Sequence, residues 1–313
     1  MTNDPEAALG ALLEELRERG YRFVTPTPAT HARVLARPDR RQARDLADVL
    51  GWSLPFARDL LEPALFALLA RADAIEPAGD GRWRSRYRVS TLHGHLFLHS
   101  AYPTDATDAV FFGPDSYRFA DLVAAELAIC PHRPGARIVD IGTGAGVGAV
   151  VAATLCPQAA IAMTDVNPRA LALACVNARA AGVAAQPIEG DTLAGIEGPI
   201  DVALANPPYI VDEAGRAYRD GGGMHGGEVS LEMARMAVDR LAPAGRFILY
   251  TGSAIVRGRD RLGEALAALA VENGCALRYR EIDPDVFGEE LETPAYADVD
   301  RIALVAAVVT KAG

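Results

Sequence analysis

An apolar run that changes abruptly into alternating glycines is the feature that most limits how this chain can fold. It reads Ile138-Val-Asp-Ile-Gly-Thr-Gly-Ala-Gly-Val-Gly148. The apolar residues predict a buried strand, and the glycines predict a sharp turn that leaves room for a ligand against the backbone before a helix begins. The free N–H groups at the start of such a helix favour a ligand carboxylate. The candidate cofactor-binding residues of this loop are Gly142, Thr143, Gly144 and Gly146.

On both sides of this loop, apolar runs typical of buried strands alternate with segments of helical spacing. Strands are expected over 136–141, 160–164, 200–205, 246–250 and 302–309, with a further one ending at 189–191, and helices around 147–155, 168–181, 228–241 and 259–273. This order predicts an α/β fold with a Rossmann-like, mostly parallel seven-stranded sheet and helices on both faces. Ligands of such sheets bind at the carboxyl ends of the strands.

Residues 1–100 have a different pattern and predict a smaller, winged-helix-like N-terminal module, followed by the larger domain over 101–313. Helices are expected over 7–19, 39–50 and 53–70, the last with Ser53 as its N-cap. Alternation then predicts a hairpin strand that carries four arginines, Arg82, Arg84, Arg86 and Arg88. These arginines fit either the solvated face of an edge strand or a wing that binds RNA or an acidic partner.

The bulk composition narrows the classes of partner. A formal net charge of −10 disfavours a long nucleic-acid footprint without excluding a local one. The four cysteines (Cys130, Cys156, Cys175, Cys275) are far apart and form no metal-binding spacing, so we expect free thiols and no metal. The N-terminus does not resemble a signal peptide and no apolar run has the length of a membrane span, so we expect a cytoplasmic protein.

Acidic residues follow three of the expected strands. Asp140 can pair with the ammonium of an amino-acid ligand, a group that S-adenosylmethionine (SAM) carries and NAD lacks. Asp165, with its neighbour Val166, is placed to hold ribose hydroxyls, as in either SAM or dinucleotide sites. Asp191, with Thr192, is placed to accept from an adenine amino group, or Asp191 is the N-cap of a following helix. Together these acids favour SAM, although the glycine loop alone also satisfies a dinucleotide fingerprint.

The sequence Asn206-Pro-Pro-Tyr209 follows directly on the expected strand 200–205. Two prolines end the strand pairing and impose a rigid turn. Asn206 and the Pro207 carbonyl can each accept an N–H from an amide or aromatic amine. These two hydrogen bonds would turn the lone pair of the acceptor nitrogen toward the SAM methyl group. Asn206 is also expected to border the cofactor. Tyr209 can stack on the planar group. The turn therefore predicts transfer of a methyl group to a planar nitrogen.

Residues 111–255 resemble the class I SAM-dependent methyltransferases with an NPPY motif, closest to the HemK-like group that acts on protein glutamine and to its relatives that act on nucleobases. The resemblance implies SAM as cofactor and places Asp115, in Phe111-Phe-Gly-Pro-Asp-Ser-Tyr117, in a segment that closes over SAM. The other interpretation of Asp115 is a helix N-cap. The glycine-rich stretch 210–227, which includes Gly221-Gly-Gly223, is expected to form a lid over the acceptor.

Three acceptors stay open at this point: a protein glutamine, a nucleobase in RNA or DNA, and a small metabolite. The negative charge favours the first and third, and the arginine hairpin favours the second. Two other functions are also considered, a non-catalytic SAM-binding regulator and a SAM enzyme that performs a different reaction. A regulator would have no use for the acceptor clamp at Asn206.

Overall fold

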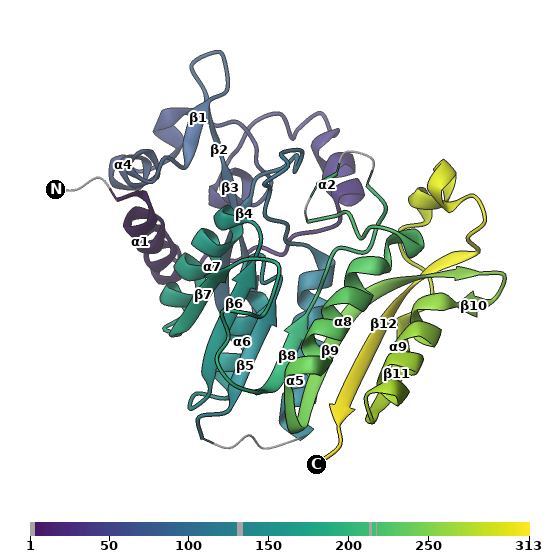
Figure 1. The fold of residues 1–313 in the computed structure, drawn as a ribbon. Helices are drawn as coiled ribbons and strands as arrows, with labels where there is room; N and C mark the ends of the chain where they lie inside the picture. Colours follow the sequence, from purple (N-terminus) through teal and green to yellow (C-terminus); the bar gives the residue numbers. More distant parts are fainter. Residues whose placement is uncertain (1–3, 130–133, 213–214, 217) are drawn as a thin grey trace.

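The computed structural model describes residues 4–129, 134–212, 215–216 and 218–313. Its centre is one large sheet (Figure 1) with strand order β11-β12-β9-β8-β5-β6-β7, and the two-residue β10 pairs with β9. The strands are β5 (Arg137–Ile141), β6 (Ala160–Asp165), β7 (Ala185–Glu189), β8 (Ile200–Ala205), β9 (Leu241–Val256), β10 (Arg259–Asp260), β11 (Cys275–Asp283) and β12 (Arg301–Lys311). The five strands from β7 to β9 run parallel, and β12 is antiparallel to both of its neighbours. The expected mostly parallel, Rossmann-like sheet is confirmed.

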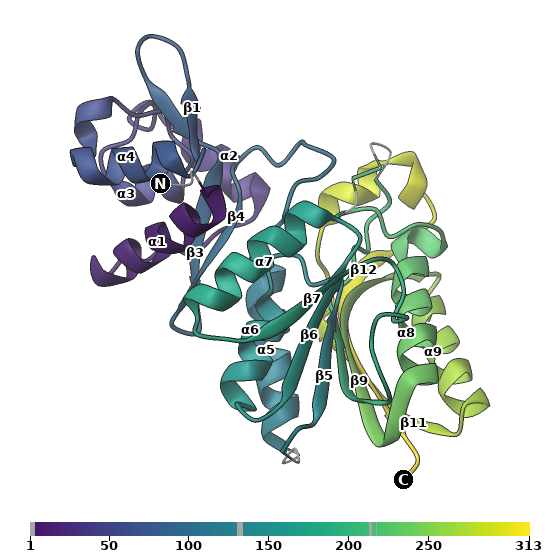
Figure 2. The same ribbon diagram turned by 60° about the vertical axis from the view of Figure 1, so that its left-hand side comes forward.

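Helices cover both faces of this sheet. Figure 2 shows α5 (Pro114–Ile129), α6 (Val147–Leu155) and α7 (Pro168–Ala180) on one face and α8 (Glu228–Arg240) and α9 (Arg261–Glu272) on the other. The sheet is therefore buried on both faces, which explains why its central strands are almost continuously apolar. Their carboxyl ends open at one edge, where the glycine loop lies.

The N-terminal module differs from its expected pattern. It consists of α1 (Pro5–Glu18), α2 (Pro28–Leu35), α3 (Leu46–Leu50), η1 (Arg58–Leu60), α4 (Pro63–Arg71), β1 (Ile75–Pro77), β2 (Trp83–Ser85), β3 (Tyr87–Leu92) and β4 (His95–Ser100). The helix expected over 39–50 is confined to α3, and the one expected over 53–70 is mostly α4. Ser53 is no N-cap, because its φ is +55° and its hydroxyl accepts from the Tyr102 N–H at 3.1 Å.

The arginine hairpin is not one strand with one charged face. Arg84 and Arg86 are exposed, and each pairs with an acid, Glu76 at 2.7 Å and Asp73 at 3.0 Å. Arg88 belongs to the next strand, β3, where it is 3% exposed and donates to the Ser100 carbonyl at 3.1 Å. Neither interpretation of the hairpin therefore holds for Arg88, since it forms no part of an open cationic surface.

The N-terminal module packs against α7 of the larger domain (Figure 2). The Asn177 amide accepts from the Leu98 N–H at 2.8 Å and donates to the Leu98 carbonyl at 3.0 Å and to the Ala145 carbonyl at 2.9 Å. Apolar residues of both parts belong to one buried cluster. This fully buried amide therefore joins the module to the glycine loop itself.

Among the residues that the structure describes, no helix combines the length and apolar character that a membrane crossing requires. Cys156, Cys175 and Cys275 carry free thiols, and Cys130 lies outside the described residues.

Candidate active site

The glycine loop connects β5 to α6 in the expected way. Gly142, Gly144 and Gly146 have φ values of +65°, +54° and +83°. A residue with a β-carbon rarely adopts this conformation, so alternate glycines are required for the turn. Gly146 is the left-handed N-cap residue of α6 and has no side chain of its own to cap the helix, although the third N–H, that of Ala149, donates to Asp140. The start of α6 therefore presents free donors to a cavity at the carboxyl end of the sheet.

Asp140, on β5, connects the glycine loop to the start of α6 through two hydrogen bonds. Its Oδ2 accepts from the Thr143 hydroxyl at 2.6 Å and from the Ala149 N–H at 2.9 Å. Gly148 makes room for the carboxylate, because a β-carbon there would lie 2.5 Å from Asp140 Oδ1. Asp140 is 2% exposed, and this burial raises its pKa to about 7 although the two donors oppose the shift. Asp140 is also one of the residues that line the cavity.

Asp165, at the end of β6, lies on the same cavity. Its carboxylate accepts from the Gly144 N–H and the Asn167 N–H, both at 2.9 Å, and burial raises its pKa. Each oxygen keeps a second lone pair, so Asp165 can still accept from a ligand hydroxyl. Its neighbour Val166 is 56% exposed and also borders the cavity.

Asp191 borders the cavity too, and it is exposed. No described helix begins between Asp191 and the 3₁₀ turn η2 (Met224–Gly226), so the N-cap interpretation of Asp191 is wrong. The Thr192 hydroxyl accepts from the Ala194 N–H at 3.4 Å, and Thr192 is absent from the described residues that line the cavity. Asp191 is therefore the member of this pair that a ligand can reach.

The cavity has a volume of about 380 Å³, within the range of small-molecule sites. The glycine loop and the ends of β6 and β8 form its floor. On the α8 side, Val229, Met233 and Met236 line the cavity with apolar side chains, together with the exposed Glu232. The spacing of the three apolar residues, four and then three, puts them on one helical face. These three residues were not among the predicted site residues, although the helical periodicity of 228–241 places them on one face.

Asn206 is the first residue after β8 and lies in this cavity. It is half-buried, and its side-chain amide has no hydrogen bond to another described residue. Pro208 contacts the cavity, whereas Pro207 is buried and absent from the described residues that line it. A polar amide held on a rigid turn with its donor and acceptor free is prepared for a ligand, since most half-buried amides find a protein partner.

Tyr209 has a different place from the one expected. It is 7% exposed, and among the described residues that line the cavity it is absent, as is Asp115. The Tyr209 hydroxyl donates to Asp115 Oδ2 at 2.7 Å, and the Tyr250 hydroxyl donates to Asp115 Oδ1 at 2.9 Å. A ring buried in this way does not offer its face to an acceptor, which corrects the stacking expected for Tyr209. It anchors the turn that carries Asn206.

Asp115 is likewise neither a helix N-cap nor a cavity residue. It lies in the first turn of α5, which begins at Pro114. Burial raises the pKa of its carboxyl, and the two tyrosine hydroxyls oppose that shift. Asp115 therefore ties the start of α5 to the turn after β8 and to β9, and its expected contact with the cofactor is corrected to this supporting role.

Glycines of the stretch after the turn pack against Tyr209, and Gly221, Gly222 and Gly223 are absent from the described residues that line the cavity. A β-carbon at Gly226 would overlap the Tyr209 carbonyl, and one at Gly221 would lie 2.7 Å from the Tyr209 Cα. A β-carbon at Gly252, on β9, would overlap the Tyr209 ring. Backbone therefore approaches Tyr209 from several sides, so Gly221 and Gly226 support the turn. Within the stretch 210–227, where the lid was expected, Tyr218 and Asp220 are the described residues that line the cavity.

Residues 122–255 match the family described as Methyltransferase small domain. A release factor glutamine methyltransferase from Deinococcus radiodurans is 35% identical over 293 residues, which cover 89% of this chain and 95% of that protein. Another, from Moorella thermoacetica, is 31% identical and covers 77% of this chain and 87% of that protein. The crystal structure of Trm5b from Pyrococcus abyssi, 17% identical, has a similar fold with a TM-score of 0.50 over 76% of this chain and 62% of that one.

Proposed function

This chain belongs to the release factor glutamine methyltransferase family and is a SAM-dependent N-methyltransferase, and we propose that its acceptor is the side-chain amide of a glutamine in a release factor. The observation that carries the proposal is the free amide of Asn206, which shares one cavity with the glycine loop and Asp165. A primary amide offers two N–H donors on a planar nitrogen, which matches two acceptors at the turn after β8.

The donor set of the cavity fits SAM. We assign the methionine part to Gly142, Thr143, Gly144 and Gly146, whose backbone turns around the cavity, with Asp140 as the partner of the ammonium. Asp165 and Val166 would hold the ribose, and Asp191 the adenine, with Thr192 supporting the loop next to it. The wall of α8 supplies the apolar surface that an adenine ring requires.

The chemistry that SAM supplies is an electrophilic methyl group on its sulfonium. The turn after β8 orients the acceptor: Asn206 Oδ1 takes one N–H and the Pro207 carbonyl takes the other. Two such hydrogen bonds localise the amide lone pair and point it in one direction, and alignment of this kind accounts for a large part of catalysis in bimolecular transfers. No strong general base is required for the attack itself.

Residues 1–100 are proposed to recognise the acceptor protein and residues 101–313 to perform the transfer. The direct link from Asn177 to the glycine loop supports cooperation between the two. The free thiols of the described cysteines support a cytoplasmic location.

A transfer assay tests the acceptor. Purified enzyme is incubated with labelled SAM and a purified release factor, and in parallel with RNA and with a metabolite extract. We expect label in the release factor, with mass spectrometry placing one methyl group on a glutamine. Label in the RNA or the metabolites, with none in the release factor, would contradict the proposed acceptor.

Replacement of Asp165 by alanine should weaken SAM binding by roughly 1–3 kcal/mol, because ribose hydroxyls and two backbone N–H groups lose their acceptor. Isothermal titration calorimetry measures the change. Asp239→Ala, an exposed carboxylate on α8, is the matched control and should bind SAM like the wild type. An unchanged affinity in Asp165→Ala would remove this residue from the ribose site.

SAM affinity should depend on pH through Asp140. Its pKa is about 7 in the folded protein and about 4 in an unfolded chain, so the folded state keeps the proton as pH rises through this window. The free energy of unfolding therefore falls as the pH rises from the unfolded to the folded pKa. In the folded protein, the ammonium of the ligand must displace this proton in order to pair with the carboxylate. We expect SAM affinity to rise by up to about tenfold per pH unit toward pH 7 and then to level off.

Calorimetry between pH 5.0 and 7.0, in buffers with different ionisation enthalpies, detects the released proton, because an α-amino group with a pKa of about 7.7–8.0 is mostly protonated over this range. Asp140→Asn is the control, since its amide oxygen can still accept from Ala149 but carries no charge. Its affinity should be lower and nearly independent of pH. A flat profile in the wild type would mean that Asp140 does not meet the ammonium.

A further inference from the structure

A short segment, 218–220, lies beside the turn that carries Asn206. Ile210 pairs with Asp220 in a parallel bridge, with the Gly221 N–H donating to the Ile210 carbonyl at 2.8 Å and the Ile210 N–H donating to the Arg219 carbonyl at 3.2 Å. The bridge holds the segment next to the residue that follows Tyr209. Its position is therefore set by the same turn that orients the acceptor.

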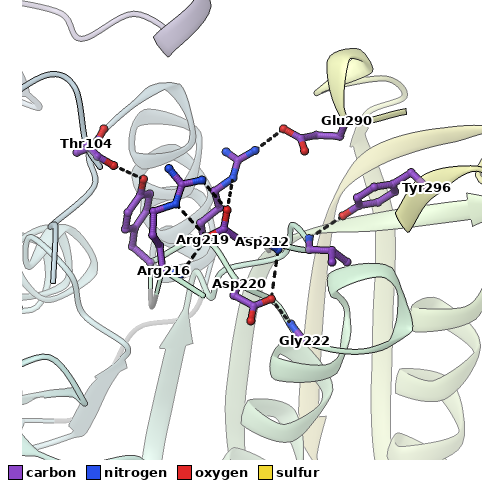
Figure 3. Close-up of polar contacts among 10 residues, drawn as sticks. Thr104, Asp212, Arg216, Arg219, Asp220, Gly222, Glu290 and Tyr296 are labelled. Atoms are coloured by element: carbon purple, nitrogen blue, oxygen red, sulfur yellow. Dashed lines mark hydrogen bonds and ion pairs between the residues drawn. The ribbon is translucent and has the colours of Figure 1, made fainter. Parts of the chain in front are cut away.

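Side chains of this segment alternate between two sides. Tyr218 and Asp220 line the cavity, whereas Arg219 between them pairs with Asp212 at 3.5 Å and with Glu290. Figure 3 shows Arg219 directed at Glu290, with Asp220 on the other side of the chain. Tyr218 and Arg219 lie in a turn, because the N–H groups of Arg219 and Asp220 both donate to the Arg216 carbonyl at 2.9 Å. The ion pairs of Arg219 hold its side chain away from the cavity that its two neighbours line.

Both the hydroxyl and the ring of Tyr218 have a partner that holds the side chain in place. Its hydroxyl donates to the Thr104 carbonyl at 2.6 Å, and its ring lies parallel to Phe111, with centroids 5.8 Å apart and 5° between the planes. Phe111 also lines the cavity. The two rings together make a rigid apolar surface beside the acceptor turn.

Asp220 is held by one oxygen and leaves the other free. Its Oδ1 accepts from the Gly222 N–H at 3.1 Å and from the Asp212 N–H at 3.4 Å (Figure 3). Its Oδ2 has no hydrogen-bond partner among the described residues, although the side chain is half-buried on the cavity wall. A carboxylate fixed in this way is an acceptor prepared for an incoming N–H, and it repels anions.

We propose that Asp220 is a specificity-determining residue that accepts a main-chain N–H of the peptide carrying the target amide, while the rings of Phe111 and Tyr218 pack against that peptide. The proposal rests on the proposed function and adds the chemical class of the acceptor. The favoured acceptor is a neutral or cationic peptide segment, and a phosphate or carboxylate next to the target nitrogen is disfavoured. This charge preference separates peptide acceptors from nucleotides at the site itself.

Asp220→Asn tests the proposal in the full-length enzyme, because it keeps the size of the side chain and one acceptor oxygen for the loop. With a purified release factor as acceptor, KM should rise tenfold or more, kcat should stay within threefold, and the Kd of SAM should stay within twofold. The matched control is Asp239→Asn, on the exposed side of α8. A KM within twofold of the wild-type value would overturn the proposal.

A second measurement needs no acceptor. Sinefungin carries an amine in place of the transferred methyl group, so its affinity relative to S-adenosylhomocysteine reports negative charge at the acceptor end of the cavity. Asp220→Asn should lower this ratio several-fold, and an unchanged ratio counts against Asp220. If the wild-type enzyme leaves the release factor unmethylated, the proposed function fails, and the sinefungin ratio still decides whether Asp220 faces the reacting centre.

Discussion

Asn206→Ala should lower kcat about a hundredfold and leave the affinity for SAM nearly unchanged. Asn206 lines the cavity, where we propose that it binds the acceptor, and no described residue makes a hydrogen bond with its side-chain amide. Loss of a hydrogen bond that aligns the attacking nitrogen costs on the order of 3 kcal/mol in the transition state, which corresponds to about two decades in rate. Steady-state kinetics with an identified acceptor, together with calorimetry for SAM, separates the two quantities.

Asn206→Asp is the sharper companion variant. It keeps the size and an acceptor oxygen, so a neutral amide acceptor should retain partial turnover. Complete loss in Asn206→Asp would show that the amide N–H₂ group also makes a required contact. Turnover of Asn206→Ala within twofold of the wild type would refute the role of Asn206 in orienting the acceptor.

Asp115→Ala should lower the free energy of unfolding by about 2–4 kcal/mol, since two buried tyrosine hydroxyls lose their common acceptor. Turnover should fall as well, because the turn after β8 is no longer tied to α5. Denaturant unfolding measures the stability, and the kinetics are measured at a temperature where the variant stays folded.

Tyr209→Phe and Tyr250→Phe should each cost less than Asp115→Ala, because each removes one donor and leaves the carboxylate with the other. Tyr279→Phe is the control for a lost tyrosine hydroxyl. Tyr279 lies on β11, at the edge of the sheet, and its hydroxyl donates to Asp260 at 2.5 Å. It should lower stability without a specific loss of turnover. If Tyr209→Phe lowers kcat no more than Tyr279→Phe does, the tie to Asp115 has no part in catalysis.

The catalytic domain was largely predictable because its signals are local. Buried parallel strands are continuous apolar runs, and the helices between them show their own periodicity, so β8 and α6 were expected at their observed limits. The N-terminal module was less predictable because its short elements are set by contacts between them. Ser53 looked like an N-cap in a helical pattern, yet its conformation is set by the hydrogen bond to the Tyr102 backbone.

Sequence alone determined the glycine loop, the acids at the strand ends and the Asn206 turn, because each is a run of neighbouring residues whose backbone requirements are local. Tertiary structure decided which of the remaining side chains reach the cavity. Asp115 accepts from Tyr209 and Tyr250, which lie 94 and 135 residues away in the chain. Because of this contact, Tyr209 supports the turn and does not stack on the acceptor as the sequence predicted. Tyr218 and Asp220 enter the cavity because Arg219 is paired on the opposite side. Such placements depend on how distant elements pack, and no local pattern in the chain encodes that packing.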